Sequence, residues 1–271
     1  MGDFVCFNGK FLRATQPLFT SQNRSFRYGD GVFETIKVYK EKILHEQLHF
    51  DRLFLSLKML QIECTINVST LSKLISELTT KNKCADLGRV RVAFFRNEQN
   101  SAEFVMETFP LSEEVNQWNE KGLVVDVYPY SRKNADAFSN LKTANFLPYV
   151  LAELFAKDRS IDDGLILNAF NNLADSSKAN IFLIKNNEIF TPALNQGCVS
   201  GVLRRFLLDE LKQNQYRIQQ GEISIDQLLE ADEVFLTNSI YDIRWVEKFK
   251  EKTYSSNLGF SIYEKIISPL Y

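Results

Sequence analysis

The sequence predicts a mixed α/β (α+β) protein with two sub-domains, and three observations lead to this fold class. Runs rich in β-branched and aromatic residues, which favour strands, alternate with segments whose apolar residues recur at helical spacing. The 271 residues are 45% apolar, which is enough to bury a sizeable core. A polar stretch at 112–121 interrupts this pattern and is the best candidate for a domain linker.

Strands and tight turns are expected near the N-terminus. Asn8-Gly9 is typical of a hairpin turn, here between strands at 5–7 and 11–12, because both residue types tolerate positive φ angles. A second turn-rich stretch at 28–31 leads into a strand over 32–39. The pattern then predicts helices over 46–61 and 70–78, followed by strands over 89–95 and 103–109.

The second half of the chain continues the mixture of strands and helices. A helix over 146–156 can hold Pro148 in its first turn, where no backbone N–H is needed. Ser224 can cap a short helix over 224–230. The remaining expected elements are a helix over 202–213 and strands over 123–128, 165–168, 181–184, 188–190 and 233–237.

Charge and composition exclude several classes of protein. The 32 basic and 34 acidic residues give a net charge of −2, which argues against a nucleic-acid binder. The four cysteines form no Cys-x-x-Cys pair, which favours reduced thiols in a cytoplasmic protein. The only histidines, His45 and His49, have no further ligand residues near them, so we expect no metal site. No signal peptide and no membrane-spanning segment are expected.

Six short segments follow one another along nearly the whole chain. They are YGDGVFET at 28–35, HFDRL at 49–53, NLKTAN at 140–145, DSSKANIF at 175–182, the stretch from TP at 191–192 to GVLR at 201–204, and LTNSI at 236–240. In this order they resemble the motifs of the class IV aminotransferases, which are fold-type IV pyridoxal 5'-phosphate (PLP) enzymes. That family includes branched-chain and D-amino acid aminotransferases and 4-amino-4-deoxychorismate lyases.

The resemblance implies a two-domain architecture. A smaller N-terminal α/β domain would span 1–112, a linker 113–121, and a larger C-terminal domain with a barrel-like sheet 122–271. PLP would lie in the cleft between the two domains. The family usually forms homodimers, so a homodimer is expected here as well.

Lys142 and Arg52 carry the two roles that the resemblance makes most specific. Lys142 occupies the segment of the family's Schiff-base lysine, whose amine must reach the cofactor aldehyde and move a proton at the substrate α-carbon. Arg52 takes the place of an arginine that binds the cofactor phosphate, which a guanidinium can bind through two oxygens. The ordinary alternatives are a surface lysine and a solvated Asp51-Arg52 pair.

The resemblance assigns further phosphate contacts to two later segments. Gly201, Val202 and Leu203 match a phosphate cup at a predicted helix start, where backbone N–H groups favour an anion. Leu203 replaces a threonine of the family, so a side-chain hydroxyl contact is absent there. Thr237 and Asn238 follow a predicted strand and could donate to the phosphate, or they could simply form a turn.

Asp175 and Asn180 match the segment that faces the cofactor's pyridine nitrogen. The family has a glutamate at the position of Asp175, and that carboxylate keeps the ring nitrogen protonated. Asp175 is one methylene shorter, so the ring must lie closer, a water must bridge the gap, or the contact is lost. The alternative interpretation of this segment is a simple Asx turn. A second departure is Leu147, where branched-chain aminotransferases have a tyrosine; Asn145 is a possible substitute.

Tyr28 and Glu34 flank the first motif, and the resemblance places residues of this strand on the substrate side of the cofactor. An aromatic core residue and an edge-strand charge are the alternatives. The first functional hypothesis is a PLP-dependent aminotransferase that converts an amino acid to a 2-oxo acid. A second is 4-amino-4-deoxychorismate lyase, which releases pyruvate and 4-aminobenzoate. A third is a non-catalytic PLP-binding protein, which the shortened carboxylate of Asp175 admits.

Overall fold

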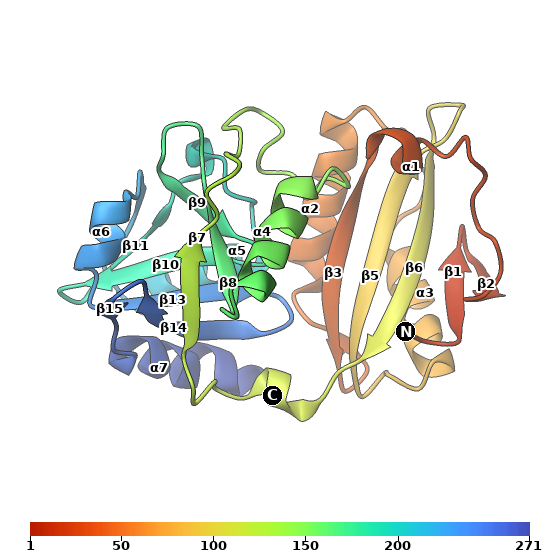
Figure 1. The fold of residues 1–271 in the computed structure, drawn as a ribbon. Coiled ribbons are helices and arrows are strands. Elements are labelled where there is room, and N and C mark those ends of the chain that lie inside the picture. The colour runs from red at the N-terminus through yellow and green to blue at the C-terminus, as the bar shows by residue number, and fades with distance from the viewer. The chain divides into compact units, whose positions relative to one another are not determined.

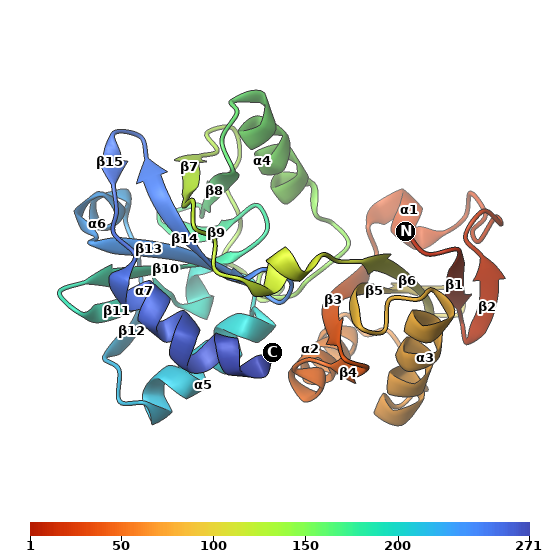
Figure 2. The ribbon, with the colours of Figure 1, turned by 90° about the horizontal axis from the view of Figure 1, so that it is seen from below.

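The computed structural model describes all 271 residues and divides into two compact units (Figures 1 and 2). Unit 1 consists of Met1–Val115 and Leu141–Phe146. Unit 2 consists of Asn116–Asn140 and Leu147–Tyr271. The first crossing between the units therefore falls inside the polar stretch at 112–121, and the six-residue segment around Lys142 belongs with the N-terminal residues.

Unit 1 is built on a six-stranded sheet in the order β2-β1-β6-β5-β3-β4. Every neighbouring pair is antiparallel, and the Asn8-Gly9 turn of the first hairpin has the expected positive φ angles of 48° and 82°. The strands are β1 (Phe4–Phe7), β2 (Lys10–Arg13), β3 (Gly31–Tyr39), β4 (Lys42–Ile43), β5 (Leu87–Arg96) and β6 (Ala102–Pro110).

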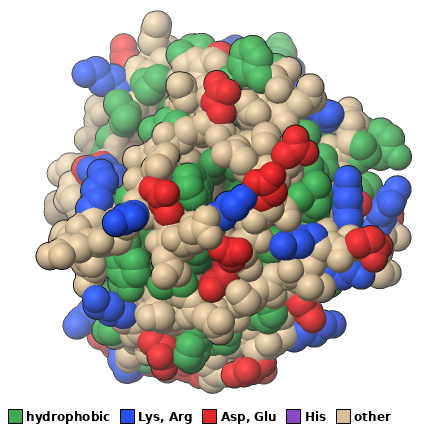
Figure 3. All heavy atoms as spheres, turned by 90° about the vertical axis from the view of Figure 1, so that its left-hand side faces the viewer, with side chains coloured by type: hydrophobic (Ala, Val, Ile, Leu, Met, Phe, Trp, Pro, Cys, Tyr) green, Lys and Arg blue, Asp and Glu red, His purple; other side chains and the backbone are tan.

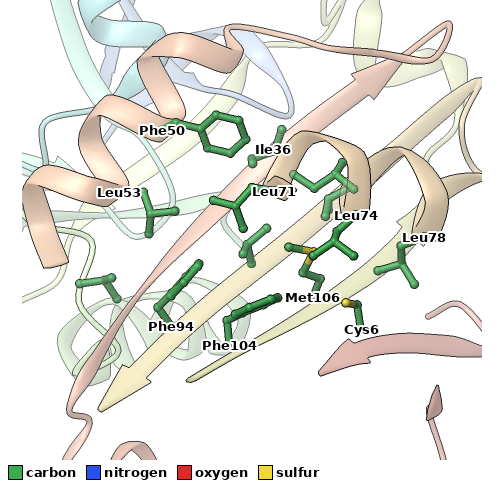
Figure 4. Packing of buried hydrophobic residues seen from close by; sticks show 14 of the residues in the cluster. Cys6, Ile36, Phe50, Leu53, Leu71, Leu74, Leu78, Phe94, Phe104 and Met106 are labelled. Atoms are coloured by element: carbon green, nitrogen blue, oxygen red, sulfur yellow. The ribbon is translucent and has the colours of Figure 1, made fainter. Parts of the chain in front are cut away.

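Two amphipathic helices, α2 (Glu46–Met59) and α3 (Val68–Lys81), cover one face of this sheet and confirm the helical spacing in the sequence. Figure 4 shows their apolar side chains pointing into a shared core with those of the strands. Burial of each such side chain stabilises the fold by about 1.5–3 kcal/mol. The labelled core residues are Cys6, Ile36, Phe50, Leu53, Leu71, Leu74, Leu78, Phe94, Phe104 and Met106.

One short helix of unit 1 departs from the expected turn. Helix α1 (Arg24–Tyr28) begins at Asn23, whose side chain accepts the N–H of Phe26, and it ends at Gly29 with a φ of 65°. Tyr28 is thus the last residue of a helix. The turn that we expected at 28–31 is reduced to the glycine cap that separates this helix from β3.

Unit 2 contains a nine-stranded sheet in the order β12-β11-β10-β13-β14-β7-β8-β9, with β15 beside β14. Pairs β11–β12, β14–β7 and β7–β8 are parallel, and the others are antiparallel. The last strand, β9, also contacts β10 and β11, so the sheet curves round on itself. The strands are β7 (Leu123–Val127), β8 (Asp163–Leu167), β9 (Leu173–Ser176), β10 (Asn180–Lys185), β11 (Glu188–Pro192), β12 (Ile218–Gly221), β13 (Glu233–Asn238), β14 (Asp242–Phe249) and β15 (Lys252–Thr253).

Four α-helices accompany this sheet, and α5 and α7 pack on one apolar core with it. Ser224 caps α6 as expected, and Gln227 completes a capping box. The α-helices are α4 (Leu147–Asp158), α5 (Val202–Gln213), α6 (Ile225–Glu230) and α7 (Asn257–Ile262). Short 3₁₀ or π turns are η1 (Glu113–Asn116), η2 (Leu194–Gln196), η3 (Tyr263–Ile267) and η4 (Ser268–Leu270).

The surface is mixed in charge. On the face shown in Figure 3, acidic and basic side chains are interspersed among polar and apolar ones, in keeping with the net charge of −2. None of the helices combines the length and the apolar character that a membrane span needs.

Candidate active site

The predicted site residues divide between the two units, and each set is described by itself. In unit 1, the segment that carries Lys142 pairs with the start of β3. The N–H of Phe33 donates to the Lys142 carbonyl at 2.9 Å, and the N–H of Ala144 donates to the Gly31 carbonyl at 2.8 Å. These hydrogen bonds fix the backbone from which the lysine side chain extends.

Two aromatic rings surround the amine of Lys142. Its Nζ lies 4.6 Å from the ring centroid of Phe33 and 5.0 Å from that of Phe146. The two rings themselves meet edge to face at 5.3 Å. Each cation–π contact is worth about 0.5–1 kcal/mol at an exposed site, so the two contacts favour this position of the amine. Other lysines of the chain, such as Lys81, also lie over a ring, but Lys142 lies near two rings and has intermediate exposure.

Arg52 and Glu34, both predicted site residues, are bonded to each other in unit 1. Arg52 Nε donates to Glu34 Oε1 at 2.7 Å, and Arg52 Nη2 donates to Glu34 Oε2 at 2.5 Å. His49, on the same helix as Arg52, bonds through Nδ1 to Glu34 Oε2 at 2.7 Å. Helix α2 thus places Arg52 and His49 within hydrogen-bond distance of the buried Glu34 carboxylate on β3.

The charges in this cluster are set by burial and by these bonds. Burial alone would raise the pKa of Glu34, but the charge of Arg52 and the hydrogen bond from His49 outweigh it and lower the pKa to about 2. Burial lowers the pKa of His49, against the opposing pull of Glu34. A neutral His49 donates through Nδ1, which leaves its buried Nε2 without a hydrogen-bond partner.

Asp175 lies at the centre of the predicted site in unit 2. It belongs to strand β9 and is 2% exposed. Its Oδ2 accepts from Lys133 Nζ at 2.9 Å and from the Tyr149 hydroxyl at 2.8 Å. Its Oδ1 accepts from Asn180 Nδ2 at 2.9 Å, and the N–H of Val199 lies between the two oxygens. The Asx-turn alternative for Asp175 is therefore wrong, because its side chain bonds to other parts of the fold.

A second buried carboxylate, Asp163, anchors the residues that follow Asp175. Ser176 Oγ donates to Asp163 Oδ2 at 2.7 Å, and both the hydroxyl and the N–H of Ser177 donate to Oδ1. Burial raises the pKa of Asp163, while the serine hydrogen bonds oppose that rise. The two serines of the motif thus act as structural partners that fix the end of β9.

Two of the predicted phosphate residues of unit 2, Gly201 and Thr237, are both neighbours of Asn180. Gly201 is the N-cap of α5 and provides no side-chain cap. A Cβ atom added to Gly201 would overlap Asn180 Oδ1, and Asn180 is the β10 partner of Thr237 on β13. The Thr237 hydroxyl is buried without a hydrogen-bond partner. An orphaned donor beside an uncapped helix start is the arrangement that an anion satisfies.

The other predicted residues have varied surroundings. Val202 and Leu203 are buried, and Leu203 packs in the core, so only their backbone N–H groups can serve a ligand. Asn238 Oδ1 accepts from the N–H groups of Ile240 and Tyr241, as in an ordinary turn. Tyr28 is 64% exposed at the end of α1.

Lys133 and Tyr149 are the polar residues of this site that the sequence motifs do not reveal. Lys133 lies outside all six motifs, and Tyr149 was expected only as part of a helix. Lys133 forms a bridge with Asn168 just after β8, Tyr149 belongs to α4, and β9 with Asp175 pairs with β8. Their contact with Asp175 therefore depends on how the fold brings three distant stretches together. The only signal in the sequence was Tyr149, a polar residue within an otherwise apolar helix turn. Such a residue fits many structural roles.

These residues lie on a mixed α/β scaffold made of two compact units. The family model for amino-transferase class IV matches residues 31–249, and the chain belongs to that family. This confirms the family, fold class and enzyme class expected from the motifs.

Relatives and solved structures extend the comparison. The aminodeoxychorismate lyase of Bacillus subtilis (strain 168) is 28% identical over 263 residues, covering 94% of this chain and 89% of the relative. The D-alanine aminotransferase of Listeria innocua is 24% identical over 248 residues, covering 88% and 85%. The solved branched-chain amino acid aminotransferase from Escherichia coli has the same fold, with a TM-score of 0.87 at 19% identity, covering 97% of this chain and 92% of that one.

Proposed function

We propose that this chain is a PLP-dependent enzyme in which Lys142 binds the cofactor aldehyde and moves a proton at the substrate α-carbon. The observation that carries the cofactor assignment is the buried, unpartnered Thr237 hydroxyl beside the uncapped start of α5. A phosphate group would satisfy that hydroxyl and the free backbone N–H groups together. The residues present therefore fit a phosphorylated cofactor.

The other predicted residues would hold the remaining parts of the cofactor. Asp175 supplies a fixed carboxylate for the ring nitrogen, and Asn180 orients that carboxylate from one side. Arg52, whose orientation Glu34 fixes, is the phosphate-binding candidate of unit 1. When bound, PLP supplies an aldehyde and an electron-withdrawing ring that stabilises negative charge at the substrate α-carbon.

Lys142 has two tasks that its surroundings suit. The aromatic faces of Phe33 and Phe146 restrict the position of its Nζ. A restricted amine loses less conformational entropy when it reacts. Its amine can take a proton from the substrate α-carbon and release it in a later step of the reaction. This positioned amine distinguishes the proposal from a non-catalytic PLP-binding protein, which needs no such group.

Between the two reactions, the lyase has the better support and is the one to test first. The aminodeoxychorismate lyase relative matches more of the chain, at 28% identity over 94%, than the D-alanine aminotransferase does at 24% over 88%. Leu147 stands where branched-chain aminotransferases have a tyrosine, which points away from that branch. Transamination between an amino acid and a 2-oxo acid is the second candidate, because the same Lys142 amine serves both.

The test begins with the cofactor. The purified protein is saturated with PLP and reduced with borohydride, and its peptides are weighed by mass spectrometry. We expect the cofactor mass on the peptide that contains Lys142 and no such mass in the Lys142→Ala variant. Lys73→Ala, at an exposed position of unit 1, is the matched control and keeps the adduct. Absence of a PLP adduct in the wild type contradicts the proposal.

The reaction is then identified from products. Aminodeoxychorismate is incubated with the PLP-loaded protein, and pyruvate and 4-aminobenzoate are measured together. In parallel, D-alanine, L-leucine and L-glutamate are each supplied with a 2-oxo acid, and the new amino acid is measured. We expect equal amounts of pyruvate and 4-aminobenzoate. Formation of an amino acid without 4-aminobenzoate would assign transamination instead.

A further inference from the structure

The carboxylate of Asp175 is more completely occupied than a simple partner for a ring nitrogen needs to be. Lys133 and Tyr149 both donate to Oδ2, Asn180 donates to Oδ1, and the N–H of Val199 approaches both oxygens. The strongest of these partners is Lys133, because it alone brings a full positive charge, 2.9 Å from Oδ2.

Lys133 is held firmly in this position. Its N–H donates to the Leu167 carbonyl at 2.8 Å, and its own carbonyl accepts from the Ala169 N–H at 3.1 Å. Its side chain is 10% exposed, and its Nζ lies 5.1 Å from the ring centroid of Tyr149. The ammonium is thus fixed by its backbone, by an aromatic face and by the carboxylate that it contacts.

The remaining titratable groups near Asp175 are Tyr149, Cys198 and Arg204. Burial raises the pKa of Tyr149 well above its usual value, and burial raises the pKa of Cys198 to about 12. Both groups are therefore neutral at physiological pH. Burial lowers the pKa of the Arg204 guanidinium, and the negative charge of Asp175 opposes this decrease. Arg204 stays charged. Asp175 is consequently one anion among two cations, with Lys133 in direct contact.

We propose that Lys133 is a positioning residue that neutralises Asp175 and so makes the ring nitrogen of bound PLP harder to protonate. This inference rests on the proposed function, because it concerns the same cofactor. A carboxylate without a cationic partner favours a protonated ring nitrogen, since opposite charges attract. An ammonium that already contacts the carboxylate offsets that attraction. This chain would then differ from the family at Asp175 in two ways. The side chain is one methylene shorter than the family's glutamate, and the ammonium of Lys133 lies against its carboxylate.

The direct test follows the ring nitrogen itself. The protein is loaded with PLP carrying ¹⁵N in the ring, and the nitrogen chemical shift is recorded against pH. In Lys133→Gln, which keeps a hydrogen-bond donor without the charge, we expect protonation to move to higher pH by about one unit or more. Lys133→Arg keeps the charge and should titrate like the wild type. Tyr149→Phe removes a neutral donor from the same oxygen and should shift less than Lys133→Gln.

A double variant keeps the proposal testable where Lys133→Gln fails to fold. Lys133→Gln with Asp175→Asn removes the ion pair and leaves neither member buried alone. If the charges of Lys133 and Asp175 cancel at the ring nitrogen of bound PLP, that nitrogen should titrate in this variant within about half a pH unit of the wild-type value. A protonation pH far below that of the wild type would show that the carboxylate dominates, and would overturn the proposal.

The two levels of the hypothesis fail in different ways. A wild type that shows no ¹⁵N signal from bound PLP contradicts the proposed function, and the role of Lys133 falls with it. Bound PLP whose nitrogen titrates identically in the wild type and Lys133→Gln contradicts only the role of Lys133. The ¹⁵N shift is independent of turnover, so a merely structural role of Lys133 would not reproduce the expected pattern.

Discussion

Arg52 and Glu34 form a two-point ion pair between helix α2 and strand β3, with N–O distances of 2.7 and 2.5 Å. Glu34 is 1% exposed, so its charge has almost no solvent to stabilise it. The backbone carbonyl of Arg52 also accepts the hydroxyl of Ser56 at 2.6 Å. A residue expected to bind phosphate thus also neutralises a buried acid of its own unit.

Removal of Arg52 should cost stability as well as cofactor affinity. Arg52→Ala leaves the buried carboxylate of Glu34 without its cation, and we expect the free energy of unfolding to fall by about 3–5 kcal/mol. Urea unfolding of the cofactor-free protein measures this change. The double variant Glu34→Gln/Arg52→Met, which leaves no charge behind, should recover part of the loss. An Arg52→Ala protein within about 1 kcal/mol of the wild type would contradict the prediction.

The stability of the protein should fall in two stages as the pH is lowered. His45 and His49 have folded pKa values below the usual 6.5, and that of His45 is about 4. Their contribution to the free energy of unfolding is therefore fully present above pH 6.5 and declines below it. Glu34 has a folded pKa of about 2 against a usual 4.5, so its contribution is lost as pH falls from 4.5 toward 2.

Urea midpoints measured from about pH 8 downward check this prediction, with two variants to separate the stages. His45→Gln should flatten the decline between pH 6.5 and 4, and Glu34→Gln should flatten the decline below pH 4.5. A wild-type midpoint that stays constant down to pH 4 would contradict the assignment of imidazoles that stay neutral in the folded protein.

Thr237→Val should separate stability from cofactor binding. The hydroxyl of Thr237 is buried without a partner, so its replacement by a methyl group should leave the unfolding free energy of the cofactor-free protein unchanged or raise it by about 1 kcal/mol. The affinity for PLP should fall by about tenfold, which corresponds to one lost hydrogen bond to a charged group. Equilibrium dialysis with PLP and with inorganic phosphate measures the second effect. Unchanged affinity for both would exclude Thr237 from the phosphate site.

Gly201→Ala should disturb the site through Asn180. The added Cβ would overlap Asn180 Oδ1, and Asn180 also bonds to Asp175 and to the Val199 carbonyl. We expect the unfolding free energy to fall by about 1–3 kcal/mol, as for other overpacked sites. Gly221→Ala is the matched control, because no atom lies within 4 Å of its added Cβ. Equal effects of the two substitutions would contradict this account.

Local patterns predicted most of the fold, since they depend on residues close in sequence. Helices α2, α3 and α5 have apolar residues at helical spacing, and the Asn8-Gly9 hairpin has turn residues with positive φ. Not every element was predicted. Strand β9 was hidden by its polar Asp-Ser end, and its burial depends on contacts with β8 and β10.

The chemistry of the site was harder to predict than its location. The motifs located Lys142, Asp175 and Gly201, and the functional roles of these residues remain predictions. Two of their partners come from distant parts of the sequence: Lys133 contacts Asp175, and Phe33 lies beside Lys142. Sequence spacing carries no information on such pairs, because the fold brings them together. Phe146, by contrast, is only four residues from Lys142.

The stretch Leu141–Phe146 ties the completion of unit 1 to a late moment in protein synthesis. The chain leaves unit 1 after Val115 and returns at Leu141, so a nascent chain that ends at Val115 lacks the segment that pairs with the start of β3. The N–H of Phe33 then has no Lys142 carbonyl to bind. During synthesis, unit 1 gains these hydrogen bonds only after Phe146 has been made, and Lys142 belongs to the last segment of unit 1 to be added.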